Sequence, residues 1–425
     1  MNQFILPVVA SFACALGAVA ADQQHRFKKT VLTDKFWGEG ANFGDFNHDG
    51  KLDIVSGPYW YAGPDFTARH EYYPAKAAFT RKSADGAEEK IEGFEGALGV
   101  ANKYSDNFIA FAADFNRDGW DDILIMGFPG EATIWYENPK GGDGHWPKHI
   151  ALDVTDNESP TFADLTGDKK LEIVCSSKGF YGYAAPDAGD PTKPWPFHPI
   201  SPNNKYHKFT HGLGVGDVNG DGRPDLLEKN GWWEHPKSLA GDPVWTFHDF
   251  AFNPGSTGGS QMYAYDVNGD GRNDVITAFH AHGFGLVWWE QVRTNGGITF
   301  SQHAILNTEQ KRVPNEHGVT FSQLHALALA DMDGDGLKDL VTGKRFWAHG
   351  PSGDADSGSP AVLYWFKLVR GPKHTAEFVP HLIDESSGVG TQVVVAPCSN
   401  KNLPDIVVGN KRGTFYFQHQ TAKAK

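Results

Sequence analysis

The chain has 425 residues, of which 40% are hydrophobic, 21% are charged and 13% are aromatic, and it contains 49 Gly and 25 Pro. This composition excludes a disordered chain, collagen and a coiled coil, and the Gly and Pro residues indicate a fold with many turns. The 38 basic and 52 acidic residues leave a net charge of −14, the wrong sign for a protein that binds nucleic acid or an anionic membrane.

Residues 1–20 resemble a secretory signal peptide. They carry no charged side chain, are apolar from Phe4 to Val19, and end in Ala18-Val19-Ala20, which is an A-x-A cleavage pattern. No later stretch is long and apolar enough to span a bilayer as a helix. We therefore expect an exported protein, periplasmic or extracellular, whose residues 21–425 form a single domain.

An acidic loop recurs along the rest of the chain. Its first copy is Asp45-Phe-Asn47-His-Asp49-Gly50-Lys-Leu-Asp53, and four later copies keep the same spacing. A sixth copy, at residues 164–172, is degraded, and a seventh survives mainly as Leu403-Pro404-Asp405. Such a repeat indicates that one supersecondary unit is used several times.

Each unit is predicted to contain four short strands. The strand that enters the loop has small or alternating residues (212–218, 326–332), and the strand that leaves it is β-branched (53–56, 339–342). The third strand is aromatic (133–137, 286–290, 362–366), and the fourth ends near a recurring histidine, which we interpret as structural. Seven such units predict an all-β, seven-bladed β-propeller.

The acidic loops are candidate calcium sites. Oxygen ligands at positions 1, 3, 5 and 9, with Gly at position 6, suit Ca²⁺, and the loops resemble the FG-GAP calcium loops between strands one and two of integrin-type propellers. Plain Asx turns are the alternative. We expect about five structural calcium ions, with none at the degraded copies. The expected ligands are Asp45, Asn47, Asp49, Asp53, Asp114, Asn116, Asp118, Asp122, Asp217, Asn219, Asp221, Asp225, Asp266, Asn268, Asp270, Asp274, Asp331, Asp333, Asp335 and Asp339.

A second group of polar residues is expected at the mouth of the central channel. Counting back six residues from the first Asp of each loop marks the start of each innermost strand, and the residues there are Glu39, Phe108, Glu158, His211, Ser260 and His325. The connections between strands two and three open on the same face. From these we expect substrate contacts by Tyr59, Trp60, Lys178, Lys229, Lys344, Arg345 and His349.

Carboxylate and imidazole groups in one funnel could bind a transition metal such as zinc, or act as general acid and base. His280-x-His282 would place two imidazoles on one side of a strand. The candidate ligands are therefore His211, His280, His282 and His325. The alternative is a hydrated channel in which these histidines bind only water.

Residues 211–234 and 324–349, in which a histidine precedes an acidic loop, look like bacterial FG-GAP/VCBS-repeat proteins related to the propeller domain of aldos-2-ulose dehydratase. The resemblance extends over residues 25–420, and only the His-bearing flanks make it specific. It implies a metal-dependent lyase that removes water from keto-sugars by β-elimination. In that case His211 and His325 would be bases or metal ligands, and Glu158 an acid/base or ligand.

Two other functions fit the same residues. One is a secreted carbohydrate-binding or adhesion propeller without catalysis, and the other is a polysaccharide lyase that acts on uronates. In each case the expected partner is a small sugar or an oligosaccharide. Neither a G-x-S-x-G nor a P-loop motif occurs in the sequence, which argues against those two chemistries.

Overall fold

The computed structural model describes residues 23–83, 85–96, 103–142 and 144–423, so the expected signal peptide lies outside the described residues. The prediction of an all-β chain is confirmed. A single 3-10 turn, η1 (Pro372–His374), is the only helical element in these ranges. Within them, no helix has the length and apolar character needed to cross a membrane.

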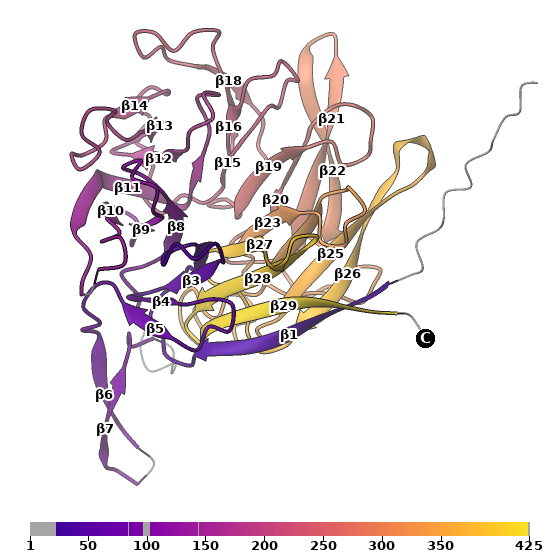
Figure 1. The fold of residues 1–425 in the computed structure, drawn as a ribbon. Coiled ribbons are helices and arrows are strands. Elements are labelled where there is room, and N and C mark those ends of the chain that lie inside the picture. The colour runs from indigo at the N-terminus through magenta and orange to yellow at the C-terminus, as the bar shows by residue number, and fades with distance from the viewer. Residues whose placement is uncertain (1–22, 84, 97–102, 143, 424–425) are drawn as a thin grey trace, which may run out of the picture.

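Three sheets have four strands each. They consist of β2 (Asn42–Gly44), β3 (Asp53–Ser56), β4 (Tyr59–Tyr61) and β5 (Arg69–Glu71); of β23 (Leu327–Ala330), β24 (Asp339–Gly343), β25 (Leu363–Arg370) and β26 (Ala376–Asp384); and of β27 (Val393–Asn400), β28 (Leu403–Asn410), β29 (Gly413–Lys423) and β1 (Gln23–Thr33). A separate hairpin is formed by β6 (Ala78–Lys82) and β7 (Glu88–Glu92) and projects from the body of the molecule (Figure 1).

Two larger sheets complete the fold. One contains β8 (Ile109–Ala113), β9 (Asp122–Met126), β10 (Glu131–Tyr136), β11 (Lys148–Ala163), β12 (Glu172–Ser177), β13 (Phe180–Ala184) and β14 (Phe197–Pro199). The other contains β15 (Leu213–Gly216), β16 (Asp225–Glu228), β17 (Gly231–Glu234), β18 (Thr246–Asp249), β19 (Gln261–Tyr265), β20 (Asp274–Ala278), β21 (Leu286–Thr294) and β22 (Gly297–Leu306).

Each larger sheet joins two antiparallel meanders of four strands. Strand β11 pairs with β10 through its first half and with β12 through its second half, so it serves both meanders. The sequence predicted two separate strands here, whereas the structure has one strand with a register shift between Asp156 and Thr161. In the other sheet, β15 and β19 join their meanders by a short parallel contact.

The meanders lie side by side around a common centre (Figure 1). Residues of the innermost strands β2, β8, β11, β19, β23 and β27 line one cavity of about 230 Å³. The last meander takes its outer strand from the N-terminal side of the chain, because β1 pairs with β29 from Gln23 opposite Lys423 to Thr33 opposite Thr414. This pairing joins the two ends of the described chain, and the repeat pattern did not predict it.

A buried carboxylate at position 9 of each acidic loop stabilises its meander. The side chain of Asp53 accepts one hydrogen bond from the backbone N–H of Phe46 (2.9 Å) and another from that of Gly63 (2.8 Å), beyond β4. The same pair of bonds recurs at Asp122, Asp225, Asp274 and Asp339. These bonds tie each loop to the backbone in or just beyond the third strand, so the position has a structural role in every complete loop.

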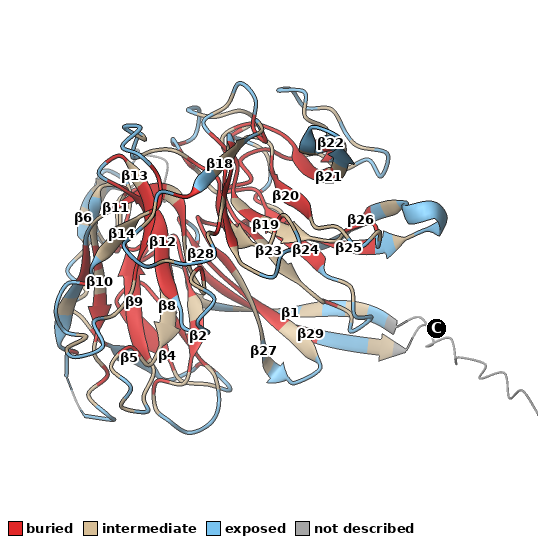
Figure 2. Cartoon of the chain, turned by 90° about the horizontal axis from the view of Figure 1, so that it is seen from above, coloured by how far each residue is buried: buried red, intermediate tan, exposed pale blue. Residues whose placement is uncertain are grey.

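The recurring histidines of the fourth strands stack on aromatic rings of the third strands. The ring centroids of Trp232 and His248 are 4.0 Å apart, and those of Trp288 and His303 are 4.2 Å apart. His248 also contacts the carboxylate of Glu234 at 2.7 Å. Burial is concentrated in the middle of the strands and exposure at the turns (Figure 2). The two described cysteines, Cys175 and Cys398, are free thiols.

Candidate functional site

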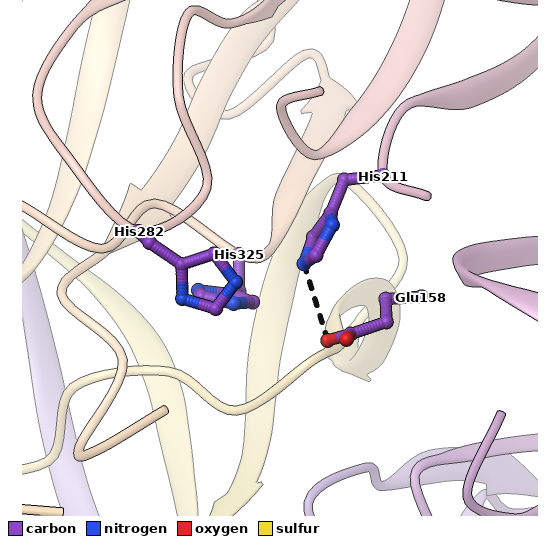
Figure 3. Close-up of side chains that lie close together, drawn as sticks. All are labelled: Glu158, His211, His282 and His325. Atoms are coloured by element: carbon purple, nitrogen blue, oxygen red, sulfur yellow. Dashed lines mark ion pairs between the residues drawn. The ribbon is translucent and has the colours of Figure 1, made fainter. Parts of the chain in front are cut away.

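Four side chains from different meanders converge at the inner ends of the sheets. His211 directly precedes the turn into β15, His325 precedes β23, Glu158 lies in β11, and His282 lies in the connection from β20 to β21. Each offers one ligand atom, and these four atoms all lie within 4.8 Å of one another (Figure 3). Because the strands are antiparallel, this cluster lies at the opposite ends of the inner strands from the acidic loops.

The hydrogen bonds of His211 define which nitrogen faces the cluster. Its Nδ1 lies 3.0 Å from the carbonyl oxygen of Phe209, which can only accept, so Nδ1 carries the proton. Nε2 points to Glu158 Oε2 at 3.2 Å, so either a proton on Nε2 or a bound cation lies between the two atoms.

His325 provides a second reason to expect a cation. Its side chain is buried, and neither ring nitrogen has a hydrogen-bond partner among the described residues. Leaving such a group unpaired costs about 1–3 kcal/mol. Burial also lowers the pKa of His325 well below its usual value, so the ring is neutral and able to bind a metal.

Behind His282 lies a carboxylate that orients it. Asp354 Oδ1 accepts from Nδ1 of His282 (3.1 Å) and from Nδ1 of His349 (2.7 Å), while Oδ2 accepts the backbone N–H of His349 (2.7 Å). Burial alone would raise the pKa of Asp354, but the bonds from the two histidines outweigh it and hold the pKa well below its usual range. The bond to Asp354 raises the pKa of His349, whereas burial lowers that of His282. Both rings therefore turn Nε2 away from Asp354.

Cationic side chains surround the two carboxylates of the site. The guanidinium of Arg345 directly contacts Glu39 and lies 3.7 Å from Glu158 Oε2. Burial would raise the pKa of Glu158, but His211 and Arg345 outweigh it and lower the pKa to about 2. Lys411 lies 3.9 Å from Glu39, and burial lowers its pKa to about 8. Glu158 is therefore ionised, as a metal ligand must be.

Three residues of the cluster, Glu158, His211 and His282, line a cavity of about 420 Å³. The opposite wall is aromatic, because Phe128 packs edge to face on Phe108 and Phe209, with centroids 5.6 Å and 5.3 Å away, and lies 5.3 Å from the Tyr104 ring. The cavity thus has a polar wall and an apolar wall, as small-molecule sites usually do. Its lining residues are Tyr104, Phe108, Phe128, Glu158, Phe209, His211, Thr257, His282, Arg345, Ala348 and His349.

The expected metal ligands and the observed cluster differ at one position. His280 was expected beside His282 on a strand, but residues 279–283 form a turn in which the Nδ1 of His280 accepts the N–H of His282 at 3.1 Å. Without the alternation of a strand, only His282 reaches the cluster, and Glu158 takes the fourth place. The donor set is then three imidazoles and one carboxylate, which suits zinc or a similar divalent ion.

The residues expected to bind substrate divide into two groups. Arg345 and His349 line the cavity. Lys344, the residue before Arg345, is buried and donates to Ser322 Oγ at 3.1 Å. Burial lowers the pKa of Lys344 to about 8. The structure does not bring the others to the cavity. Tyr59 and Trp60 are buried against Trp37 and His70, Lys178 contacts Asp153, and Lys229 bonds the carbonyl of Ser256.

Several residues of the site were not anticipated from the sequence, including Asp354 and three aromatic residues. Asp354 lies in a Gly- and Ser-rich loop with no repeat counterpart, and Tyr104, Phe128 and Phe209 lie in connections of unequal length. Asp354 could have been suspected because it follows His349 by five residues, but nothing in the spacing links it to His282. Its distance from His282 depends on the contact between two meanders.

The acidic loops have the turn geometry that their pattern predicts. In the first loop, Asp45 accepts the backbone N–H groups of Asp49 (3.0 Å) and Gly50 (2.9 Å), which curls the chain around the carboxylates. Ligand atoms of Asp331, Asp333 and Asp339 lie within 4.8 Å of one another, and so do those of Asp164, Asp168 and Glu172 in the degraded copy. The longer Glu172 side chain thus replaces the usual Asp there.

Comparisons with known proteins agree with the repeat. A model described as FG-GAP-like repeat matches residues 114–175 and 266–342. No curated protein matches the chain. Three similar solved structures are the Photorhabdus luminescens Tc holotoxin pore, the V. cholerae biofilm matrix protein Bap1 and rhamnogalacturonan lyase YesW. Sequence identity is 15%, 18% and 11%, respectively, and the TM-scores are 0.38, 0.32 and 0.38. The alignments cover 87%, 68% and 92% of this chain and 18%, 41% and 75% of the other chains.

The chain therefore spans less than half the length of the first two of these proteins. Its own sheets and repeats define the class to which it is similar: an FG-GAP-repeat protein with a β-propeller-like fold.

Proposed function

We propose that the four-stranded meanders are the blades of an exported seven-bladed β-propeller whose complete acidic loops hold structural calcium ions. Two observations support this arrangement. The pairing of β1 with β29 gives the last meander its fourth strand. The first Asp of each complete loop accepts a backbone N–H, and in the last complete loop the ligand atoms of Asp331, Asp333 and Asp339 lie within 4.8 Å of one another. Calcium binding would then stabilise the end of each blade opposite the cavity.

For the cavity, we propose a metal-dependent carbohydrate lyase or dehydratase that acts on keto-sugars or oxidised glycosides by β-elimination. The observation that carries this proposal is the cluster of Glu158, His211, His282 and His325, three of which (Glu158, His211 and His282) line a cavity large enough for a small ligand. A divalent ion held there would supply Lewis-acid polarisation of a substrate carbonyl.

The remaining residues of the site are assigned by their contacts. His349 lines the cavity, and its Nδ1 proton is held by Asp354, so its Nε2 is placed to remove the acidic proton next to the carbonyl. Glu158, with a pKa of about 2, is too weak a base for this step and is better suited as a ligand. Arg345 places positive charge beside the cavity, where it stabilises a developing enolate oxygen.

The test uses the purified protein and a panel of keto-sugars and oxidised glycosides, with the ultraviolet absorbance of a conjugated enone as the readout. We expect enone formation that disappears after chelation of the metal and in His211→Ala, whose calcium loops are untouched. His349→Ala should retain the metal and lose turnover. Activity of His211→Ala at the wild-type rate would refute the assignment of the site.

Two alternatives remain as distinct outcomes of the same test. A polysaccharide lyase acting on uronates is favoured by the guanidinium of Arg345 in the cavity, and it would release unsaturated uronate products from polymers and leave small keto-sugars unchanged. A carbohydrate-binding or adhesion propeller would bind sugars without turnover, and its binding would survive chelation.

A further inference from the structure

A second cavity, of about 340 Å³, adjoins the first. Phe128, in the connection from β9 to β10, lines both cavities. The second cavity is bounded by one face of β10, from which Ala132, Ile134 and Tyr136 project together as alternate residues of a strand. The two cavities therefore meet at Phe128.

The second cavity combines an aromatic surface with exposed polar groups. The rings of Tyr73 and Tyr136 stack with centroids 5.1 Å apart and an angle of 14° between their planes. The hydroxyl of Tyr73 donates to Asp106 Oδ1 at 3.1 Å. Asp106, Glu131 and Lys148 are exposed residues of the lining, so the cavity opens to solvent on their side.

This composition suits a neutral sugar residue. A pyranose ring has an apolar C–H face, which packs on aromatic rings, and hydroxyl groups, which donate to carboxylates and accept from an ammonium. Two carboxylates and one ammonium line the cavity, so its charge is negative and disfavours a uronate or a phosphorylated sugar. The charge is thus opposite in sign to that of the Arg345 side of the first cavity.

From these contacts we infer that the second cavity is a subsite for a neutral glycosyl unit, and that the natural ligand is an oligosaccharide of at least two residues. The reacting sugar occupies the first cavity, and the next residue passes Phe128 and packs on Tyr73 and Tyr136. The identity of the reacting sugar rests on the proposed function, whereas the second subsite rests on its own residues. A simple packing role for these tyrosines would give no difference between monosaccharides and disaccharides.

The experiment measures binding and does not depend on turnover. Neutral, unoxidised methyl β-cellobioside, β-xylobioside and β-maltoside are compared by calorimetry with the methyl monosaccharides of the same series. Ala132→Trp fills the second cavity from β10, Tyr73→Ala removes the outer ring of the stacked pair, and Ala240→Trp adds the same bulk at an exposed position in the connection from β17 to β18. Thermal unfolding checks that each variant folds.

We expect at least one disaccharide to bind tenfold or more tightly than its monosaccharide, a gain of about 1.4 kcal/mol. Ala132→Trp and Tyr73→Ala should abolish the gain and leave monosaccharide binding unchanged, while Ala240→Trp should keep it. The inference is overturned if no disaccharide binds more tightly than its monosaccharide, or if Ala132→Trp retains the gain. A disaccharide gain together with no enone formation from the panel of keto-sugars and oxidised glycosides would refute the lyase proposal and leave the subsite standing.

Discussion

Asp354 provides a quantitative test of the metal site, because it contacts the site only through other residues. Its carboxylate accepts three N–H groups, two from the rings of His282 and His349 and one from the backbone of His349. In Asp354→Asn, one of the two oxygens becomes an NH₂ group, which cannot accept, and the negative charge is lost. The bond from His282 Nδ1–H then loses either its acceptor or the negative charge that strengthens it, so His282 is held less firmly with Nε2 toward the cluster.

Partners of metal-binding histidines typically account for about 10–100-fold in metal affinity, which corresponds to about 1.4–2.7 kcal/mol. We expect a loss of that size for Asp354→Asn, measured as competition for Zn²⁺ with a chromophoric chelator. Asp356→Asn is the matched control, since Asp356 lies in the same loop and pairs with Arg312. A Zn²⁺ affinity for Asp354→Asn that equals that of Asp356→Asn would refute the reasoning.

Three further predictions concern the Glu and His cluster, the acidic loops, and the pairing of β1 with β29. His325→Leu should stabilise the metal-free protein by about 1–3 kcal/mol in chemical denaturation, because it removes unpaired buried nitrogens; a less stable variant would contradict this. Burial raises the pKa of Asp53 to about 6, of Asp225 to about 7 and of Asp122 to about 8. Such groups favour folding below their unfolded pKa and lose this contribution as pH rises through the folded value. In excess chelator the Tm should therefore fall from pH 5 to about pH 8, and calcium should remove the fall; an equal fall with calcium would count against bound ions. Deleting residues 1–33 should lower the Tm because β29 loses its partner β1, and an unchanged Tm would show that this pairing does not stabilise the fold.

The repeat made much of the architecture predictable from the sequence. Strand β3 coincides with the predicted residues 53–56, and β24 extends the predicted residues 339–342 by one residue. These strands are set by local pattern, since each begins at an Asp whose carboxylate accepts backbone N–H groups of its own unit. Strand β11 departed from prediction because no turn interrupts residues 148–163, so one strand serves two meanders.

The sequence by itself determined which residues stand at the inner ends of the strands, because Glu158, His211 and His325 each stand six positions before the first Asp of their loop. That distance is local and repeats with the unit. Only the tertiary structure decided which of these residues meet, that His282 joins them while His280 does not, and that Asp354 orients His282. These contacts connect different meanders, and the physical reason is that they depend on how the meanders close around a common centre, which the spacing within one unit does not specify.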